Sequence, residues 1–387
     1  MCPTRQQEAV LIGHCAHARY VWNLCVEQES WWRQGRGKVP GLADRCRQLT
    51  EARADNPWLA AGSVTVQQQA IRDHDQAMAS FFAGTHGQPS WRKAGRNEGF
   101  RIVHLKPGDV RRLSRNTGEV RVPKAGWIRF RWSRRPPDGM KSFRVTRDRA
   151  GRWHVAFAVI PDPVGGPGTA AVVGIDRGIA ISAALSTGEM LRVPALTGRE
   201  QDRLRRLQRS LNRTQRRSCR HREVKTAIAK LKARETDRRK DWCEKASTDI
   251  ARRFDVIRVE DLHITNMTRS ARGSGDNPGR NVRAKAGLNR GILGSGWGLL
   301  VRRLQDKAPG RIEQVSPAFT SLRCSACGHI AAESRKSQAL FRCVACAFAC
   351  NADVNAARNI AAGHAVTARG RSPLGRRKNR EPQLSTP

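Results

Sequence analysis

The sequence is short of long hydrophobic runs, of tyrosine and of acidic residues, and the first two shortages exclude whole classes of protein. No run of about 18 apolar residues is present, so we expect no membrane-spanning helix. The first residues, MCPTRQQEAVL, lack the basic segment and apolar core of a secretory signal. Tyr20 is the only tyrosine and lies in a helical apolar pattern, which argues against a recombinase that acts through a covalent tyrosine.

The shortage of acidic residues leaves 72 Lys and Arg against 33 Asp and Glu, a formal net charge of +39. Self-repulsion of this size disfavours a compact state unless a polyanion neutralises it. Arginine far outnumbers lysine, and guanidinium groups favour bidentate phosphate contacts and stacking on bases. Nucleic acid is therefore the expected partner, although a GC-rich genome that inflates arginine would account for part of the excess.

Most of the 11 cysteines are scattered, which suits a reducing cytosol better than a disulfide scaffold. Four of them form two Cys-x-x-Cys pairs, Cys324/Cys327 and Cys343/Cys346, with fifteen residues between the pairs. This is the spacing of a zinc ribbon, in which each pair lies on a tight knuckle and four thiolates surround one Zn²⁺. Asp353 follows seven residues after Cys346, where a helical pattern begins.

Hydrophobic periodicity predicts two different parts before residue 161. Residues 5–95 have helical spacing, with Ser63 as the expected N-cap of a later helix. From residue 100 to 160 the period is two, and Arg149-Ala150-Gly151 gives a hairpin signal. Arginines alternate with Trp and Phe there, which indicates either a solvated face or a groove that follows a nucleic-acid backbone. PDPVGGPGT, residues 161–169, is expected to be a linker.

After the linker the patterns predict an α/β architecture. AAVVGIDRGIAISAALST predicts a buried strand, a glycine turn and a second strand, while FDVIRVEDL predicts a strand covered on both faces, as in parallel sheets. GRIEQVSP predicts a further strand. Residues 199–240 predict one long helical run, with 17 Lys and Arg against 5 acids, that is either solvated or binds phosphates. Residues 269–296, rich in Gly, Asn and Arg, predict a mobile loop.

Three carboxylates stand out by their positions. Asp176 and Glu260 each end a predicted strand, and Asp353 begins a helix after the cysteines. Acids at the carboxyl ends of neighbouring strands face the crevice where ligands bind, and three of them could hold two Mg²⁺ about 4 Å apart. A lone Asp at a strand end is more often a turn or cap residue, which is how we interpret Asp261. The order of strand, strand, cysteine pairs and Asp favours a joint site.

Six stretches carry a resemblance to a known family: YVWNLCVEQ, GIDRGIAISAALSTGE, VIRVEDLHITNMTRSARG, PGRNVRAKAGLNRGIL, SPAFTSLRCSACG and CNADVNAARNI. The last four together are highly specific. The chain resembles, from about Gln7 to Gly363, the TnpB proteins of bacterial insertion sequences, which are relatives of the type V CRISPR effector nucleases and were long described as OrfB-type transposases.

The resemblance implies an α/β fold, an RNase H-like (RuvC) nuclease domain with an inserted zinc ribbon. The implied ranges are 1–13 for a partial start of the β module, 14–98 for a helical recognition lobe, 99–164 for a wedge-like antiparallel β module, 165–319 for the first part of the nuclease domain, 320–348 for the zinc ribbon, 349–368 for the last part of the nuclease domain, and 369–387 for a basic disordered tail. Because the chain begins at MCPTRQQE, we expect the family's first β-strand to be missing.

The implied activity is RNA-guided cleavage of DNA by two-metal-ion hydrolysis, with a guide RNA and target DNA as partners and no membrane. The catalytic triad, which would bind two Mg²⁺, falls on Asp176, Glu260 and Asp353. The structural Zn²⁺ falls on Cys324, Cys327, Cys343 and Cys346. A cytoplasmic, nucleoid-associated bacterial protein is expected. The alternatives are a catalytically inactive or truncated DNA- and RNA-binding relative, or an accessory transposase protein.

Three residues depart from the family pattern. Arg177 stands beside the first acid, where many relatives carry an apolar residue, and Asn351 replaces an acid that is common two residues before the third. Cys350 is an additional thiol near the ribbon, which we do not expect to be a ligand because four cysteines already complete a tetrahedron.

Overall fold

The computed structural model describes residues 1–31, 39–133 and 139–363, so the expected disordered tail, residues 369–387, lies outside the described residues. The chain divides into two compact units. Unit 1 comprises Met1–Pro161 and Leu196–Arg234, and unit 2 comprises Asp162–Ala195 and the chain from Glu235 onward. The first boundary falls at the start of the expected PDPVGGPGT linker. No described helix combines the length and hydrophobicity that a membrane crossing requires.

Unit 1 begins with four helices. Their bounds are α1 Arg5–Trp31, α2 Leu42–Asp55, α3 Pro57–Ala61 and α4 Val64–Phe82. The buried side chains of α1 recur every three or four residues (Leu11, Cys15, Ala18, Trp22 and Cys25), so one face of the helix enters the core. Ser63 is the N-cap of α4, as expected, although its side chain makes no capping hydrogen bond.

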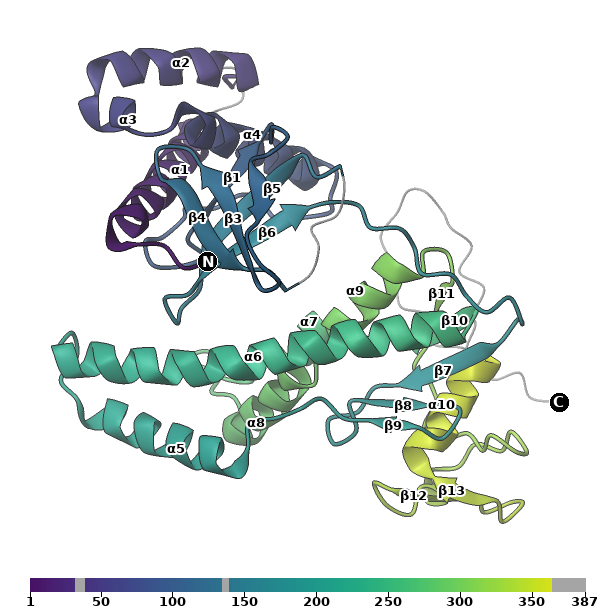
Figure 1. Cartoon of the computed structure of the whole chain (residues 1–387). Helices are drawn as coiled ribbons and strands as arrows, with labels where there is room; N and C mark the ends of the chain where they lie inside the picture. Colours follow the sequence, from purple (N-terminus) through teal and green to yellow (C-terminus); the bar gives the residue numbers. More distant parts are fainter. Residues whose placement is uncertain (32–38, 134–138, 364–387) are drawn as a thin grey trace. The chain divides into compact units, whose positions relative to one another are not determined.

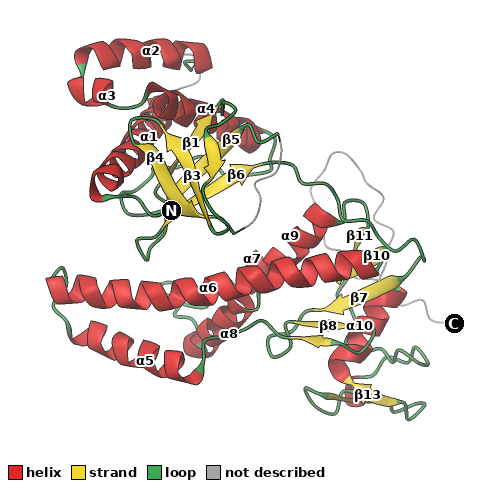
Figure 2. Ribbon diagram, in the orientation of Figure 1, coloured by secondary structure: helices red, strands yellow, loops and turns green. Residues whose placement is uncertain are grey.

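Two three-stranded antiparallel sheets follow, with the orders β1-β5-β6 and β2-β3-β4 (Figures 1 and 2). Their strands are β1 Gly99–Val103, β2 Val110–Arg112, β3 Thr117–Val122, β4 Gly126–Arg131, β5 Ser142–Arg147 and β6 Trp153–Ala158. Buried side chains from both sheets, from α1 and from α4 form one hydrophobic core. The expected hairpin turn joins β5 to β6, with Gly151 at a φ of +81° that favours glycine.

Residues 5–13 are helical, because α1 begins at Arg5. The helical spacing predicted from residue 5 onward is therefore confirmed, and these residues are not part of the β module that the resemblance implies for 1–13. Leu11 of this stretch is fully buried in the shared core, whereas its neighbour Ile12 is exposed, as expected for a helix with one buried face. The extended start and the first turn of α1 both contact the sheets: the Met1 amino group donates to the Trp153 carbonyl at 2.7 Å, the Cys2 amide donates to the Arg129 carbonyl at 2.8 Å, and the Gln7 side-chain amide donates to the Trp127 carbonyl at 2.8 Å.

The helical run expected over residues 199–240 is two antiparallel helices, α5 Gly198–Arg213 and α6 Cys219–Arg253 (Figure 1). A single helix was therefore the wrong prediction. Apolar side chains on each helix, among them Leu204 and Leu207 of α5 and Ile228 and Leu231 of α6, pack together. Folding back lets each narrow apolar stripe cover the other, which a single solvated helix could not do.

Unit 2 is built on a five-stranded mixed sheet of order β11-β10-β7-β8-β9. Its strands are β7 Val172–Asp176, β8 Ala183–Leu185, β9 Met190–Leu191, β10 Val256–Glu260 and β11 Ile312–Val315. β7 and β11 pair with β10 in parallel, while β8 pairs with β7 in antiparallel fashion. The strands predicted in VVGID, VIRVE and RIEQV are thus confirmed. Buried side chains of α6 and α9 cover one face of the sheet.

Three helices lie between β10 and β11: α7 Ile264–Met267, α8 Val282–Gly294 and α9 Trp297–Lys307. The prediction of a mobile loop over residues 269–296 was therefore wrong for its second half. The side chains of α8 hold it in place: Lys285 donates to the Met267 carbonyl at 2.7 Å, and Asn289 donates to the Thr268 carbonyl at 2.9 Å. Glycine is unfavourable in helix interiors, so the glycines of this segment led to the prediction of a loop.

The last helix, α10 Ala352–Ala362, packs across β7 and follows the short hairpin of β12 Leu340–Arg342 and β13 Ala349–Asn351. Gly174 of β7 makes this close packing possible. A Cβ atom at Gly174 would lie 2.1 Å from the Ala357 carbonyl oxygen and 2.3 Å from the Ala361 amide nitrogen. The glycine before Asp176 therefore brings α10 against the strand that carries this acid.

We expect Gly174→Ala to destabilise the protein by about 3 kcal/mol or more, because the added methyl group meets helix backbone that cannot turn aside. For a unit of this size the melting temperature should fall by roughly 6–12 °C, which differential scanning calorimetry can measure. Gly165→Ala is the matched control, since a Cβ there meets no atom within 4 Å. Equal melting of the two variants would contradict this account of the packing.

Candidate active site and metal centre

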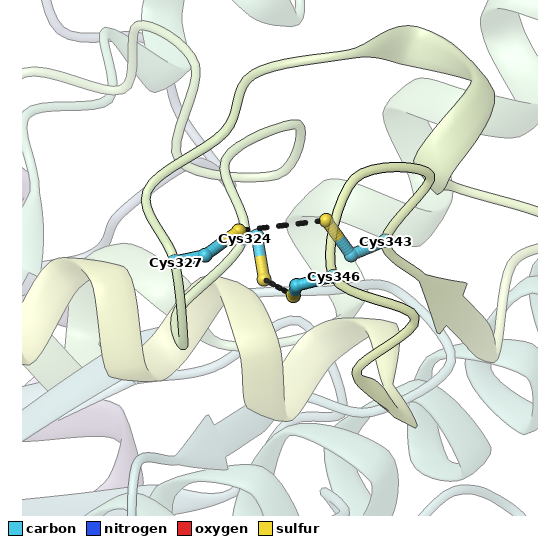
Figure 3. Close-up of side chains that lie close together, drawn as sticks. All are labelled: Cys324, Cys327, Cys343 and Cys346. Carbon is cyan, nitrogen blue, oxygen red and sulfur yellow. Dashed lines mark hydrogen bonds between the residues drawn. The ribbon is translucent and has the colours of Figure 1, made fainter.

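The four cysteines converge from two knuckles of the same shape (Figure 3). Their sulfur atoms all lie within 4.8 Å of one another, and the Cys324–Cys346 and Cys327–Cys343 Sγ–Sγ distances are 3.8 and 3.6 Å. A tetrahedron with Zn–S bonds of about 2.3 Å has edges of about 3.8 Å. The thiols are therefore spaced as ligands of one zinc ion, as the sequence predicts.

The knuckle backbones explain how two short loops place these thiols. In the first, the Gly328 amide donates to the Cys324 carbonyl at 2.9 Å; in the second, the Ala347 amide donates to the Cys343 carbonyl at 3.1 Å. Both turn residues have positive φ, +80° for Gly328 and +58° for Ala347. Backbone N–H groups of Cys346 and Ala345 lower the pKa of the Cys343 thiol. A backbone bond with Phe348 lowers the pKa of the Cys346 thiol, but contacts with the other three thiols outweigh it and raise this pKa, so the clustered thiols titrate as a group.

The three predicted acids lie at one end of the unit 2 sheet. β7 and β10 are parallel neighbours whose last paired residues are Ile175 and Val259, so Asp176 and Glu260 come next on adjacent strands. Asp353 lies in the first turn of α10, which packs on β7. The charges of Glu260 and Asp353 both act on Asp176. Among the described residues only the cysteines form a set of ligand atoms within 4.8 Å, so the carboxylates are less tightly gathered.

Burial and mutual repulsion change the acidity of these groups. Burial, followed by the charges of Glu260 and Asp353, raises the pKa of Asp176 to about 7. Burial also raises the pKa of Glu260 and of Asp353. The Arg335 guanidinium acts in the opposite direction, because it lies 3.6 Å from an Asp353 carboxylate oxygen and lowers the pKa of both aspartates. The arrangement therefore favours a cation near the acids.

Three further residues contact the acids, and none of them was assigned a role in this site from the sequence. Arg335, from the segment between the two cysteine pairs, pairs with Asp353. The Thr320 hydroxyl donates to Glu260 Oε1 at 2.8 Å. The buried Arg177 guanidinium donates to the Glu260 carbonyl oxygen. Arg177 could be distinguished from the many other arginines only by its position beside Asp176. No feature of the sequence distinguished Arg335 or Thr320.

The other two departures from the family pattern also have structural places. Asn351 is the N-cap of α10, and its side-chain oxygen accepts from the amides of Asp353 at 2.9 Å and Val354 at 3.2 Å. An amide therefore caps the helix at the position where the family resemblance leads us to expect an acid. Cys350 is half-buried and does not belong to the cluster of four thiols, in line with the expectation that it is not a ligand.

Comparison with known proteins places these features in one family. Residues 159–271 match the OrfB_IS605 model, described as "Probable transposase", and residues 297–360 match the Cas12f1-like TNB domain. The chain is 35% identical over 377 residues to the Escherichia coli K12 protein named RNA-guided DNA endonuclease InsQ, covering 95% of this chain and 92% of that protein. A Streptomyces pristinaespiralis protein named RNA-guided DNA endonuclease is 30% identical over 378 residues, covering 95% and 89%.

Solved structures give the same result for the fold. The Cas12f1 chain of a Cas12f1–sgRNA–target DNA complex superposes with a TM-score of 0.56 at 15% identity, covering 92% of this chain and 83% of that one. At this identity the likeness concerns the fold alone. The identity to the curated relatives extends over nearly the whole chain. The chain therefore belongs to the TnpB family of OrfB-type transposon proteins.

Proposed function

We propose that this protein is an RNA-guided DNA endonuclease whose RNase H-like (RuvC) domain hydrolyses DNA at Asp176, Glu260 and Asp353. The observation that carries the proposal is their placement: two acids end adjacent parallel strands and the third begins the helix packed on one of them. The names of the two full-length relatives support the activity. Residues 165–319 and 349–368 would form the nuclease domain around the ribbon at 320–348.

The chemistry of the donor set fits two Mg²⁺ ions. Carboxylate oxygens are the ligands Mg²⁺ prefers, and the raised pKa of Asp176 reflects first its burial and then the nearby negative charges, which a bound cation would offset. When bound, the ions would activate the attacking water and stabilise the leaving 3′ oxygen. Asp176, Glu260 and Asp353 would hold them, while Arg335 would add positive charge beside the phosphodiester. The four cysteines would bind one structural Zn²⁺.

The α5–α6 hairpin offers a surface for nucleic acid. A groove of about 570 Å³ lies between the helices, and the charged residues among those that line it are four cations and one acid: Arg203, Arg222, Lys230, Arg234 and Glu223. Exposed cations along a groove bind phosphates and release counterions. In the β module, the Arg111 guanidinium lies 4.1 Å from the Trp127 ring centroid, a pairing that also suits a base. We assign the groove to the backbone of the guide RNA or the target DNA.

Replacing Arg203, Arg222 and Lys230 together by Gln should weaken the binding of RNA or DNA at low salt and make this binding less dependent on salt concentration. Each lost phosphate contact lowers the slope of log K against log salt by about 0.7–0.9. Fluorescence anisotropy with RNA and with DNA measures both slopes. Lys245→Gln, on the same helix, is the control, because Lys245 pairs with Asp241 at 2.8 Å. A triple variant with the slope of the parent would contradict the assignment.

The proposed function is tested by cleavage. The protein is purified with the RNA that accompanies it from a host carrying the transposon, and matched DNA is then supplied with Mg²⁺. Cleavage that requires the RNA, the matching DNA and Mg²⁺ together supports the proposal. Mg²⁺-independent binding of both nucleic acids without cleavage would indicate the non-catalytic binding protein instead.

A further inference from the structure

Hydrogen bonds join α10 to the strand end that carries Glu260. Asn355 and Asn359 lie four residues apart on one face of α10, and both are buried. The Asn359 amide donates to the Thr320 carbonyl at 2.9 Å and to the Arg323 carbonyl at 2.7 Å. Asn355 also donates to the Arg323 carbonyl at 2.7 Å and accepts from the Ser325 amide at 2.9 Å. Two side chains of one helix thus fix the segment 320–325.

This segment reaches both proposed metal sites. Cys324, the first of the four clustered cysteines, lies between Arg323 and Ser325, whose backbone groups the two asparagines bind. At the other end, the Thr320 hydroxyl lies 2.8 Å from Glu260 Oε1 and 3.1 Å from the Pro317 carbonyl. A hydroxyl has one proton, and the shorter bond to an ionised carboxylate is the stronger of the two. Thr320 and Glu260 are both buried, so solvent offers Oε1 little replacement.

We propose that Thr320 is a positioning residue for Glu260, and that Asn355 and Asn359 connect its position to the cysteine knuckle that contains Cys324. This inference rests on the proposed function, in which Glu260 binds catalytic metal. Thr320 fixes the orientation of the carboxylate before any cation arrives. Removal of such a partner of a metal ligand commonly lowers metal affinity or activity by 10–100-fold.

The experiment compares Thr320→Val, which keeps the side-chain shape but removes the hydroxyl, with Thr320→Ser, which keeps the hydroxyl. Both are made in the full chain with its co-purified RNA. We expect the Mg²⁺ concentration for half-maximal cleavage to rise about tenfold in Thr320→Val and to change less than twofold in Thr320→Ser. The rise in melting temperature that Mg²⁺ produces should shrink in Thr320→Val and persist in Thr320→Ser. RNA content should match the parent in both variants. Metal-free melting should match it in Thr320→Ser and fall slightly in Thr320→Val, where the buried carboxylate loses a donor, so the Mg²⁺ shift is measured from each variant's own metal-free value.

Equal Mg²⁺ midpoints and melting shifts for Thr320→Val and the parent would overturn the inference. A Thr320→Ser protein as impaired as Thr320→Val would do the same, because packing rather than the hydroxyl would then matter. Glu260→Gln separates this outcome from failure of the proposed function: if it still cleaves, the acidic site itself is wrong. If Glu260→Gln is inactive while Thr320→Val behaves as the parent, only the role of Thr320 fails.

Asn359→Ala tests the connection to α10. Its effect on the Mg²⁺ midpoint should resemble that of Thr320→Val, and the double variant should be little worse than either single one, because both changes release the same carboxylate. Full additivity of the two effects would show that Asn359 acts independently of Thr320.

Discussion

Asp176→Asn should abolish cleavage of matched DNA, with a rate at least about a thousandfold below that of the parent. Asp176 is the acid on which the charges of both others act, so its loss removes a charged ligand from the centre of the proposed metal site. A metal ion contributes several kcal/mol of transition-state stabilisation, and each 1.36 kcal/mol corresponds to a factor of ten in rate. Single-turnover cleavage, with RNA content measured on the same sample, tests this.

Melting of the metal-free protein shows whether the Asp176→Asn variant is folded. The pKa of Asp176 is raised from 3.8 to about 7 in the folded state, so between these values the folded protein binds a proton that the unfolded chain does not. Stability of the metal-free parent therefore falls as the pH rises from about 4 to about 7. Asn carries no charge and escapes this loss. The variant should melt above the parent at pH 8 and together with it near pH 4.

Two results would contradict this reasoning. Cleavage at the parental rate would remove Asp176 from the reaction. A variant that melts below the parent at pH 8 would show that its inactivity reflects damage to the fold. A stable but inactive protein is the outcome expected when a site is held in an arrangement that favours function over stability.

The parts predictable from sequence are those that local patterns determine. A continuous apolar run ending in an acid predicts both a covered strand and an acid at its carboxyl end, as at β7 with Asp176 and β10 with Glu260. The zinc site could be predicted from the spacing of the cysteine pairs alone, because each knuckle is closed by its own backbone hydrogen bonds. Gly174, two residues before Asp176, lies where the α10 backbone packs against the strand.

The parts that the sequence did not reveal depend on contacts between distant segments. The chain turns between α5 and α6 because the apolar stripes of the two helices cover each other. Neither stripe by itself predicts this turn from the sequence. Thr320 meets Glu260 across 60 residues, and Arg335 meets Asp353 from within the ribbon. Asn355 and Asn359 have helical spacing in the sequence, yet only the fold shows that they bind the segment before the cysteine knuckle.

Loss of zinc should act first on stability, in contrast to the loss of Asp176. We expect Cys324→Ser to lose the metal, to give less soluble protein and to melt roughly 10 °C below the parent. In small zinc domains the apparent free energy of zinc binding is about 10–16 kcal/mol, and it stabilises the fold because the unfolded chain has no preformed site. Even if about 6 kcal/mol of this free energy were retained in the variant, about 4 kcal/mol would be lost. Each kcal/mol of stability lost lowers the melting temperature by about 2–4 °C in a unit of this size. Zinc content and calorimetry measure both effects.

Cys350→Ser is the matched control for the zinc prediction. Cys350 lies in the same small hydrophobic cluster as Cys324, but its sulfur is outside the group of four. It should keep one zinc per chain and the parental melting temperature. The Cys324→Ser protein that remains folded still carries all three acids, so its cleavage should be weakened through the segment that ends at Thr320 rather than abolished. Unchanged melting of Cys324→Ser would count against a structural zinc, because the ribbon would then fold without it.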